Sequence, residues 1–172
     1  MKNFLLSFLL LIVLLPASNL SAQGAENVVL ITFDGLRWQE VFGGIDQNLA
    51  THKNYSPQTE LLMQRFWHSN SNDRAQALLP FIHNTVFSQG IYAGNRHENS
   101  CAAVSNDWYF SYPGYSEILT GVINPNINSN SKVPNTEITF LELLESNSLY
   151  KAHTAAFASW DVFPFIFNAQ RS

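Results

Sequence analysis

The stretch NVVLITFDGLRWQEVFGG, residues 27–44, decides the fold that we expect for this chain. Five of the six residues from Val28 to Phe33 are apolar. Such a short continuous run is typical of a strand that is buried on both faces of a parallel sheet. Asp34 and Gly35 follow directly. Because ligands in open α/β sheets bind outside the carboxyl ends of the strands, this pattern makes Asp34 a candidate metal ligand at the mouth of a mostly parallel sheet.

An alternative is that Asp34 and Gly35 only form the turn of a β-hairpin, since Asp-Gly between two apolar runs is a strong hairpin signal. The hairpin would pair residues 28–33 with residues 36–42. The first run, however, does not alternate between apolar and polar residues as a half-exposed hairpin strand does. The apolar residues of the second run recur at nearly helical spacing and are followed by two glycines, which favours a strand followed by a short helix.

Length, charge and cysteine content limit the class of protein. A chain of 172 residues forms one domain or part of one. The net charge is −4 and no basic block occurs, so nucleic-acid binding is not indicated. The chain has 13 phenylalanines, 6 tyrosines and 4 tryptophans, which suit a sizeable core or an aromatic-lined cleft. Cys101 is the only cysteine, which excludes an intrachain disulfide and a zinc site built from several cysteines.

The N-terminal segment has the pattern of a secretory signal peptide. Lys2 supplies the positive charge, residues 4–15 are largely apolar, and small residues lead up to Ala22. We therefore expect residues 1–22 to be a signal peptide and residues 23–172 to be a secreted or periplasmic chain without a membrane partner after cleavage. The apolar run is shorter than the ~20 residues of a membrane span; an uncleaved anchor is the alternative.

A second informative stretch, NDWYFSYPGYSEILTG at residues 106–121, contains a candidate nucleophile. Residues 108–110 are predicted to be extended, and residues 117–120 to lie in a helix that ends at Gly121. Ser111 then stands at a strand-to-helix corner, where free backbone N–H groups bind anions and stabilise an alkoxide. The alternative is that Ser111 merely caps the helix.

The remaining chain predicts further helices and strands. Helices are expected at residues 59–67, at 74–89 with a break at Pro80, at 137–147 after a capping Thr136, and from Phe163. Short strands are expected at residues 90–93 and 151–158, and residues 124–135 form a loop long enough to cover a site.

Four other polar side chains have the chemistry to take part in a site. His83 is expected to be a hydrogen-bonded, partly buried histidine and not a ligand. Arg96 and His97 lie in a polar loop, and Asp161 follows the expected strand at residues 151–158. The sequence does not assign a role to these last three residues.

Two stretches together resemble the alkaline phosphatase superfamily, in its type I phosphodiesterase and nucleotide pyrophosphatase branch. LITFDGLR at residues 30–37 resembles the strand of that family that ends in a metal-binding Asp. SYPGYSEILTG at residues 111–121 resembles its nucleophile motif T-F-P-N-H-x-x-x-x-T-G, with Ser111 at the nucleophile position. The resemblance implies an α/β fold in which helices sandwich a mostly parallel sheet.

The resemblance also implies a function, namely that of a secreted, metal-dependent hydrolase of small phosphate monoesters or diesters. Two divalent ions, zinc foremost with manganese or magnesium as alternatives, would clamp the phosphoryl group. Asp34 would hold one ion, and Ser111 would bind that ion and attack phosphorus. A phosphomutase, phosphotransferase or sulfatase-like member of the same superfamily is an alternative, as is a non-catalytic secreted binding module.

The chain also departs from the family pattern. Gly114 stands where the family often has Asn, whose amide steadies a phosphoryl oxygen, and Tyr115 replaces the Arg of sulfatases. The family's later Asp-x-x-x-His and Asp-His ligand patterns do not occur before Ser172. We therefore expect residues 23–172 to be the N-terminal part of a longer metalloenzyme with an incomplete sheet. Whether this chain alone is an enzyme, and its oligomeric state, stay open.

Overall fold

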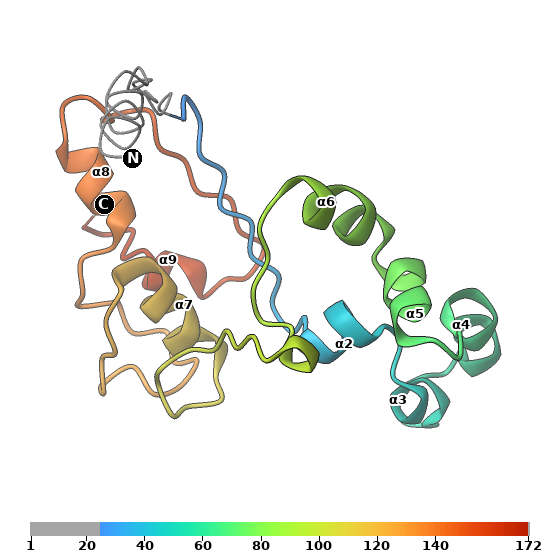
Figure 1. The fold of residues 1–172 in the computed structure, drawn as a ribbon. Coiled ribbons are helices and arrows are strands. Elements are labelled where there is room, and N and C mark those ends of the chain that lie inside the picture. Colours follow the sequence, from blue (N-terminus) through green and yellow to red (C-terminus); the bar gives the residue numbers. More distant parts are fainter. Residues whose placement is uncertain (1–24, 172) are drawn as a thin grey trace, which may run out of the picture. The chain divides into compact units, whose positions relative to one another are not determined.

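The computed structural model describes residues 25–171 (Figure 1). The chain divides into two compact units at Asp34, and each unit is considered by itself. The expected signal peptide, residues 1–22, lies outside the described residues. Between residues 25 and 171, no helix has both the length and the apolar character that crossing a membrane requires.

The expected α/β fold is wrong, because the described part of the chain is helical and contains no strand. Four segments that were expected to be strands lie outside helices and form no strand pairing with another described segment, namely residues 28–33, 90–93, 108–110 and 151–158. Their apolar side chains are exposed instead, with Val28 at 87% and Ile31 at 68%. A strand is completed by hydrogen bonds to a neighbouring strand, and no described segment supplies one here.

The hairpin alternative is wrong as well. Asp34 and Gly35 do form a turn, in which Gly35 has a φ of +73° that favours glycine. The residues that follow, however, form the helix α2 (Trp38–Gly43) and not a second strand. The short helix expected after Asp-Gly is thus present, and the turn leads directly into it.

Residues 38–89 form a group of short helices. After α2 come α3 (Gln47–Thr51), α4 (Thr59–Phe66), α5 (Ser71–Leu78), a π-helical turn at Ile82–Val86 and α6 (Phe87–Gln89). Helix α2 packs against α5. At their junction Gly44 has a φ of +73°, and a Cβ atom there would lie 2.3 Å from the Arg74 backbone. Only glycine fits this contact.

Several expectations for this group are confirmed. The helix expected at residues 59–67 is α4, and the expected break at Pro80 separates α5 from the π-helical turn. His83 is half-buried, and its Nε2 lies 2.7 Å from the carbonyl oxygen of Val41. It is therefore the hydrogen-bonded histidine that the sequence predicted.

A second group consists of α7 (Ser111–Thr120), α8 (Phe140–Ser146) and α9 (Phe163–Ile166), with α7 in contact with both of the others (Figure 1). Its core consists of Tyr112 and Leu119 from α7 together with Val162 and Ile166. Gly121 ends α7 in the left-handed conformation, with a φ of +74°, as expected. The helix expected from Phe163 is α9.

The expected cap of α8 is wrong. Thr139, and not Thr136, is the N-cap of α8, and it forms a reciprocal capping box with Glu142. The sequence fits this assignment equally well, because Thr139 stands three residues before Glu142 as the capping box requires.

Candidate functional site

Ser111 is the first residue of α7, and its hydroxyl does not cap the helix. The N-cap is Phe110, which is extended (φ −124°, ψ 150°) and has no side-chain acceptor. The alternative that Ser111 merely caps α7 is therefore wrong. Within the described chain the Ser111 N–H has no hydrogen-bond partner. This donor lies at the positive end of a ten-residue helix.

The Ser111 hydroxyl instead donates a hydrogen bond to Asp34, with Oγ 3.2 Å from Oδ1. The two residues are 77 positions apart in the sequence. Asp34 is exposed in the turn before α2, and Ser111 is half-buried. The structure thus places the two residues that the sequence singled out within direct contact of each other, at a place that solvent can reach.

Tyr112, the next residue, anchors the start of α7 in the core. Its side chain is 1% exposed, and its hydroxyl lies 2.8 Å from the carbonyl oxygen of Val133 and 3.2 Å from that of Phe165. Burial raises the pKa of Tyr112 to about 12, because the phenolate would lose its hydration. Its backbone N–H donates to Oδ1 of Asn130 at 3.0 Å. Tyr112 therefore fixes where Ser111 stands.

Glu117, one and a half turns further along α7, holds the segment that leads into the helix. Its carboxylate accepts hydrogen bonds from the backbone N–H of Ser105 and from the backbone and side chain of Asn106. These bonds, first of all the one from the Asn106 side chain, lower the pKa of Glu117 because they stabilise its charged form. Residues 105 and 106, which precede α7, are therefore held by hydrogen bonds to a side chain of the helix itself.

The described residues fit a divalent metal ion only in part. Asp34 and Ser111 offer one carboxylate and one hydroxyl oxygen, which suit zinc, magnesium or manganese. The part of the chain from residue 25 to 171 contains no group of three or more His, Cys, Asp or Glu side chains that could hold a metal ion. Two donors hold at most part of one coordination shell, so these residues do not assemble a centre with two ions.

The other candidate side chains have partners elsewhere. Arg96 lies over the ring of Trp38, with the guanidinium carbon 5.4 Å from the ring centroid, and His97 contacts the same ring edge-on. Asp161 forms an ion pair with Lys132. The structure therefore does not bring these three residues to Ser111.

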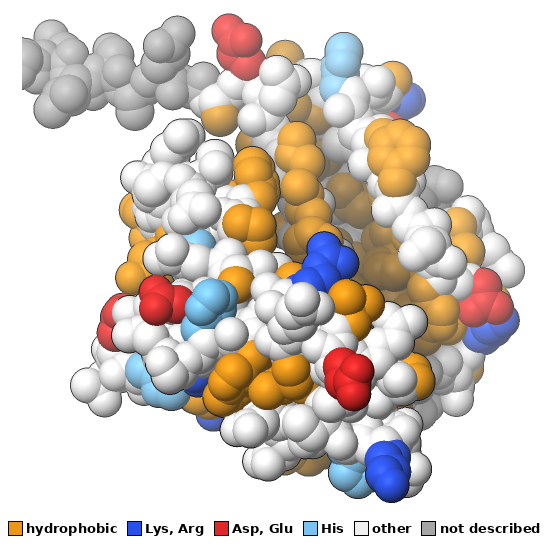
Figure 2. Space-filling model, turned by 90° about the vertical axis from the view of Figure 1, so that its right-hand side faces the viewer, with side chains coloured by type: hydrophobic (Ala, Val, Ile, Leu, Met, Phe, Trp, Pro, Cys, Tyr) orange, Lys and Arg blue, Asp and Glu red, His pale blue; other side chains and the backbone are white. Residues whose placement is uncertain are grey.

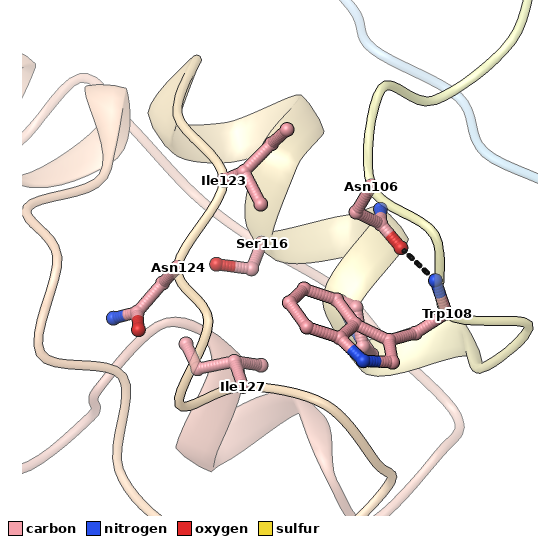
Figure 3. A pocket seen from close by; sticks show the side chains of 7 residues that line it. Asn106, Trp108, Ser116, Ile123, Asn124 and Ile127 are labelled. Carbon is pink, nitrogen blue, oxygen red and sulfur yellow. Dashed lines mark hydrogen bonds between the residues drawn. The ribbon is translucent and has the colours of Figure 1, made fainter.

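A small pocket lies beside α7 but does not include Asp34 or Ser111 (Figure 3). It is shallow, encloses no room for a water molecule, and opens to solvent. Its wall combines the Trp108 indole with apolar and amide side chains, namely Asn106, Trp108, Pro113, Ser116, Ile123, Asn124 and Ile127. Asn106 accepts a hydrogen bond from the Trp108 N–H, which fixes the indole-bearing segment. This pocket is a neighbour of the candidate site and not the site itself.

Sequence reasoning missed Asn130 and the anchoring role of Tyr112. The only sequence signal for Asn130 is its place in a loop rich in Asn, Ser and Pro, which predicts a loop but singles out no residue. Tyr112 lies inside the motif at residues 111–121, but a tyrosine at this position does not indicate which carbonyl groups its hydroxyl contacts.

The chain matched no protein-family model, no curated protein and no solved structure.

Proposed function

We propose that this protein is a secreted, metal-dependent hydrolase of small phosphate esters and that Ser111 is its nucleophile. The observation that carries the proposal is the hydrogen bond from the Ser111 hydroxyl to Asp34 across 77 positions of sequence. The resemblance of residues 30–37 and 111–121 to two motifs of the alkaline phosphatase superfamily supports the same assignment. The proposal does not rest on a parallel sheet.

The local geometry suits attack on phosphorus. The Ser111 Oγ–P bond forms as the bond from phosphorus to the leaving alcohol oxygen breaks, and the hydroxyl proton passes toward the Asp34 carboxylate that it already faces. The unpartnered Ser111 N–H and the positive end of α7 favour the anionic phosphoryl group at this position. Water then cleaves the bond between phosphorus and Ser111 Oγ, which restores the hydroxyl and releases inorganic phosphate from a monoester substrate or a phosphate monoester from a diester substrate.

A divalent ion bound at this place would stabilise the developing negative charge and lower the pKa of the hydroxyl. Asp34 and Ser111 are the residues that would hold it. The further ligands that a complete site needs are not grouped among residues 25–171. That zinc is the metal stays a prediction.

The experiment is to measure hydrolysis of p-nitrophenyl phosphate and bis(p-nitrophenyl) phosphate, with and without added zinc, for the protein as encoded by its gene. The Ser111→Ala variant should lose turnover by at least about 10³-fold, as removal of a nucleophile does in other enzymes. Ser71→Ala is the matched control, because Ser71 also opens a helix, α5, but does not contact Asp34. Undiminished turnover by Ser111→Ala would exclude Ser111 as the nucleophile.

A further inference from the structure

Asn135, in the loop between α7 and α8, is fully buried, and both polar atoms of its side chain have partners. Its Nδ2 donates one hydrogen bond to the Ser116 hydroxyl of α7 at 3.1 Å and another to the carbonyl oxygen of Ile166 in α9 at 3.2 Å. Its Oδ1 accepts the Glu137 N–H at 2.9 Å. Because the amide group is planar, these bonds together leave the Asn135 side chain a single orientation.

Tyr112 ties the same face of α7 to the same two segments. Tyr112 and Ser116 are four residues apart, so they lie on one face of the helix, and both are buried. The carbonyl oxygen of Phe165 lies 3.2 Å from the Tyr112 hydroxyl and also accepts the Asn135 N–H at 2.9 Å. The Tyr112 hydroxyl further contacts the carbonyl oxygen of Val133. Helix α7 is thus held at two successive turns by the loop that carries Asn135 and by α9.

Two attachments on one face prevent α7 from turning about its own axis. With one attachment the helix could turn, since no side-chain cap at its start opposes this. The Oγ of a helical serine lies roughly 4 Å from the helix axis, so a rotation of roughly 15° displaces it by about 1 Å. Ser111 Oγ is 3.2 Å from Asp34 Oδ1, near the upper limit for a hydrogen bond. Such a displacement would break this bond and misdirect the attack on phosphorus.

We propose that Asn135 is a positioning residue for the nucleophile. Through Ser116 it holds α7 at the rotation that directs the Ser111 hydroxyl to Asp34, and it does so without contacting the substrate. This role rests on the function proposed above and adds to it a residue that acts through the helix. A purely structural asparagine would contribute to stability alone, whereas a positioning residue also contributes to the rate of the chemical step.

The decisive variant is Ser116→Ala, which removes the acceptor in α7 and leaves the other hydrogen bonds of Asn135 in place. Alanine is also the best helix former, so the helix itself is not weakened. We expect kcat for p-nitrophenyl phosphate, with zinc added, to fall by at least about tenfold, because the Ser111 hydroxyl loses its alignment. KM should change by less than about twofold. Ser116→Cys, whose sulfur is a weaker acceptor, should give a smaller fall in kcat.

Thr139→Ala is the matched control. Thr139 is also a buried hydroxyl residue with side-chain hydrogen bonds, but its partner is Glu142 of α8 and not a residue of α7. Its loss should lower the unfolding temperature by about 2–4 °C, as the loss of an N-cap does, and leave kcat within about twofold of the wild-type value. If kcat is unchanged in Ser116→Ala as well, Asn135 only stabilises the fold and the proposal is wrong.

A second measurement does not depend on turnover. The backbone amide signal of Ser111 in ¹⁵N NMR spectra should shift in Ser116→Ala, because a rotation of α7 changes its surroundings, and should not shift in Thr139→Ala. Ser111 lies about 7.5 Å along the helix from Ser116, so the lost hydroxyl itself is distant. If Ser116→Ala does not fold, Ser116→Cys takes its place in both measurements.

An unshifted Ser111 signal overturns the inference, whether or not the chain hydrolyses esters. Full turnover by Ser111→Ala would instead overturn the proposed function, so the two failures are distinguishable.

Discussion

At the scale of single residues, Tyr112 links the nucleophile candidate to the loop that carries Asn130. Its backbone N–H contacts Asn130, while its hydroxyl reaches the carbonyl groups of Val133 and Phe165. A buried hydroxyl without partners would destabilise the fold, whereas here it bridges two segments. The position of Ser111 and the rigidity of the loop therefore depend on the same side chain.

Tyr112 makes the chain sensitive to alkali. Its pKa is raised to about 12 in the folded state, above the value of ~10 for an exposed tyrosine. The folded state then holds this proton more tightly than the unfolded state, so stability is intact below pH 10 and falls as the pH rises toward 12. The free energy of unfolding should drop by about 3 kcal/mol across this window. Urea unfolding at several pH values measures the drop.

The control for this prediction is Tyr112→Phe, which keeps the ring and removes the group that titrates. It should cost about 1 kcal/mol at neutral pH through the lost hydrogen bonds. Its stability should show a smaller decrease between pH 10 and pH 12 than that of the wild type. An equal decrease in both proteins would assign the alkaline transition to other tyrosines.

At the scale of elements, helices α7 and α8 differ in how well their N-termini are capped. Helix α8 begins with a complete capping box, whereas α7 has no side-chain cap and includes a glycine in its first turn. Both a missing cap and a helical glycine weaken a helix. Helix α7 thus owes its position to tertiary contacts.

Gly114→Ala should strengthen α7. A Cβ atom at this position would meet only the Val104 side chain, at 3.6 Å, which is an ordinary contact, and the glycine does not have a positive φ. Alanine should raise the free energy of unfolding by about 0.5–1 kcal/mol. Gly44→Ala is the contrasting variant, because its Cβ would collide with the Arg74 backbone at 2.3 Å, and it should destabilise the chain. Thermal unfolding of the two variants gives the comparison.

Glu142 makes the capping box of α8 sensitive to acid. The hydrogen bonds from Arg171, followed by those of Thr139, lower the pKa of Glu142 below its usual value of 4.5. This contribution to stability is present above pH 4.5 and is lost as the pH falls through the lowered pKa. Glu142→Gln should reduce stability at pH 7 and weaken its dependence on acid pH, which circular dichroism during an acid titration can follow. The same acid dependence in the variant would argue against a role for Glu142.

The elements also show what the sequence could and could not predict. Helices such as α4 and the end of α7 at Gly121 were predictable, because their hydrogen bonds and stop signals are local. The lack of strands at residues 28–33 and 151–158 was not predictable. An apolar or β-branched run indicates what a strand would contain but not whether a neighbouring strand is present to pair with it. Asp34 and Ser111 were found through local motifs, whereas Asn130 is joined to them only by the fold.

At the scale of the whole molecule, apolar side chains are abundant outside the core. Figure 2 shows many hydrophobic side chains at the surface of one face. Residues 28–33 are the clearest case, with Val29 at 79% and Phe33 at 67% exposed. A run of this kind, with no charge and no proline, has the composition of segments that pair with other chains.

We therefore expect the isolated chain to self-associate through this run. Ile31→Lys should reduce association, as measured by light scattering over a concentration series, because a lysine at an open strand-like segment opposes pairing. Gln39→Lys is the control, since it adds the same charge at an exposed polar position. A monomeric wild-type chain at all concentrations would contradict the expectation.

The same run has a consequence for the lifetime of the protein. Proteases bind their substrates as extended chains, and residues 28–33 have neither helical nor ladder hydrogen bonds to give up. A protease that prefers aromatic residues would cut after the exposed Phe33. That cut would turn Asp34 into a new chain end, with a positively charged amino group next to the carboxylate that faces Ser111. A single cleavage would then alter the charge of the candidate site without removing any of its side chains.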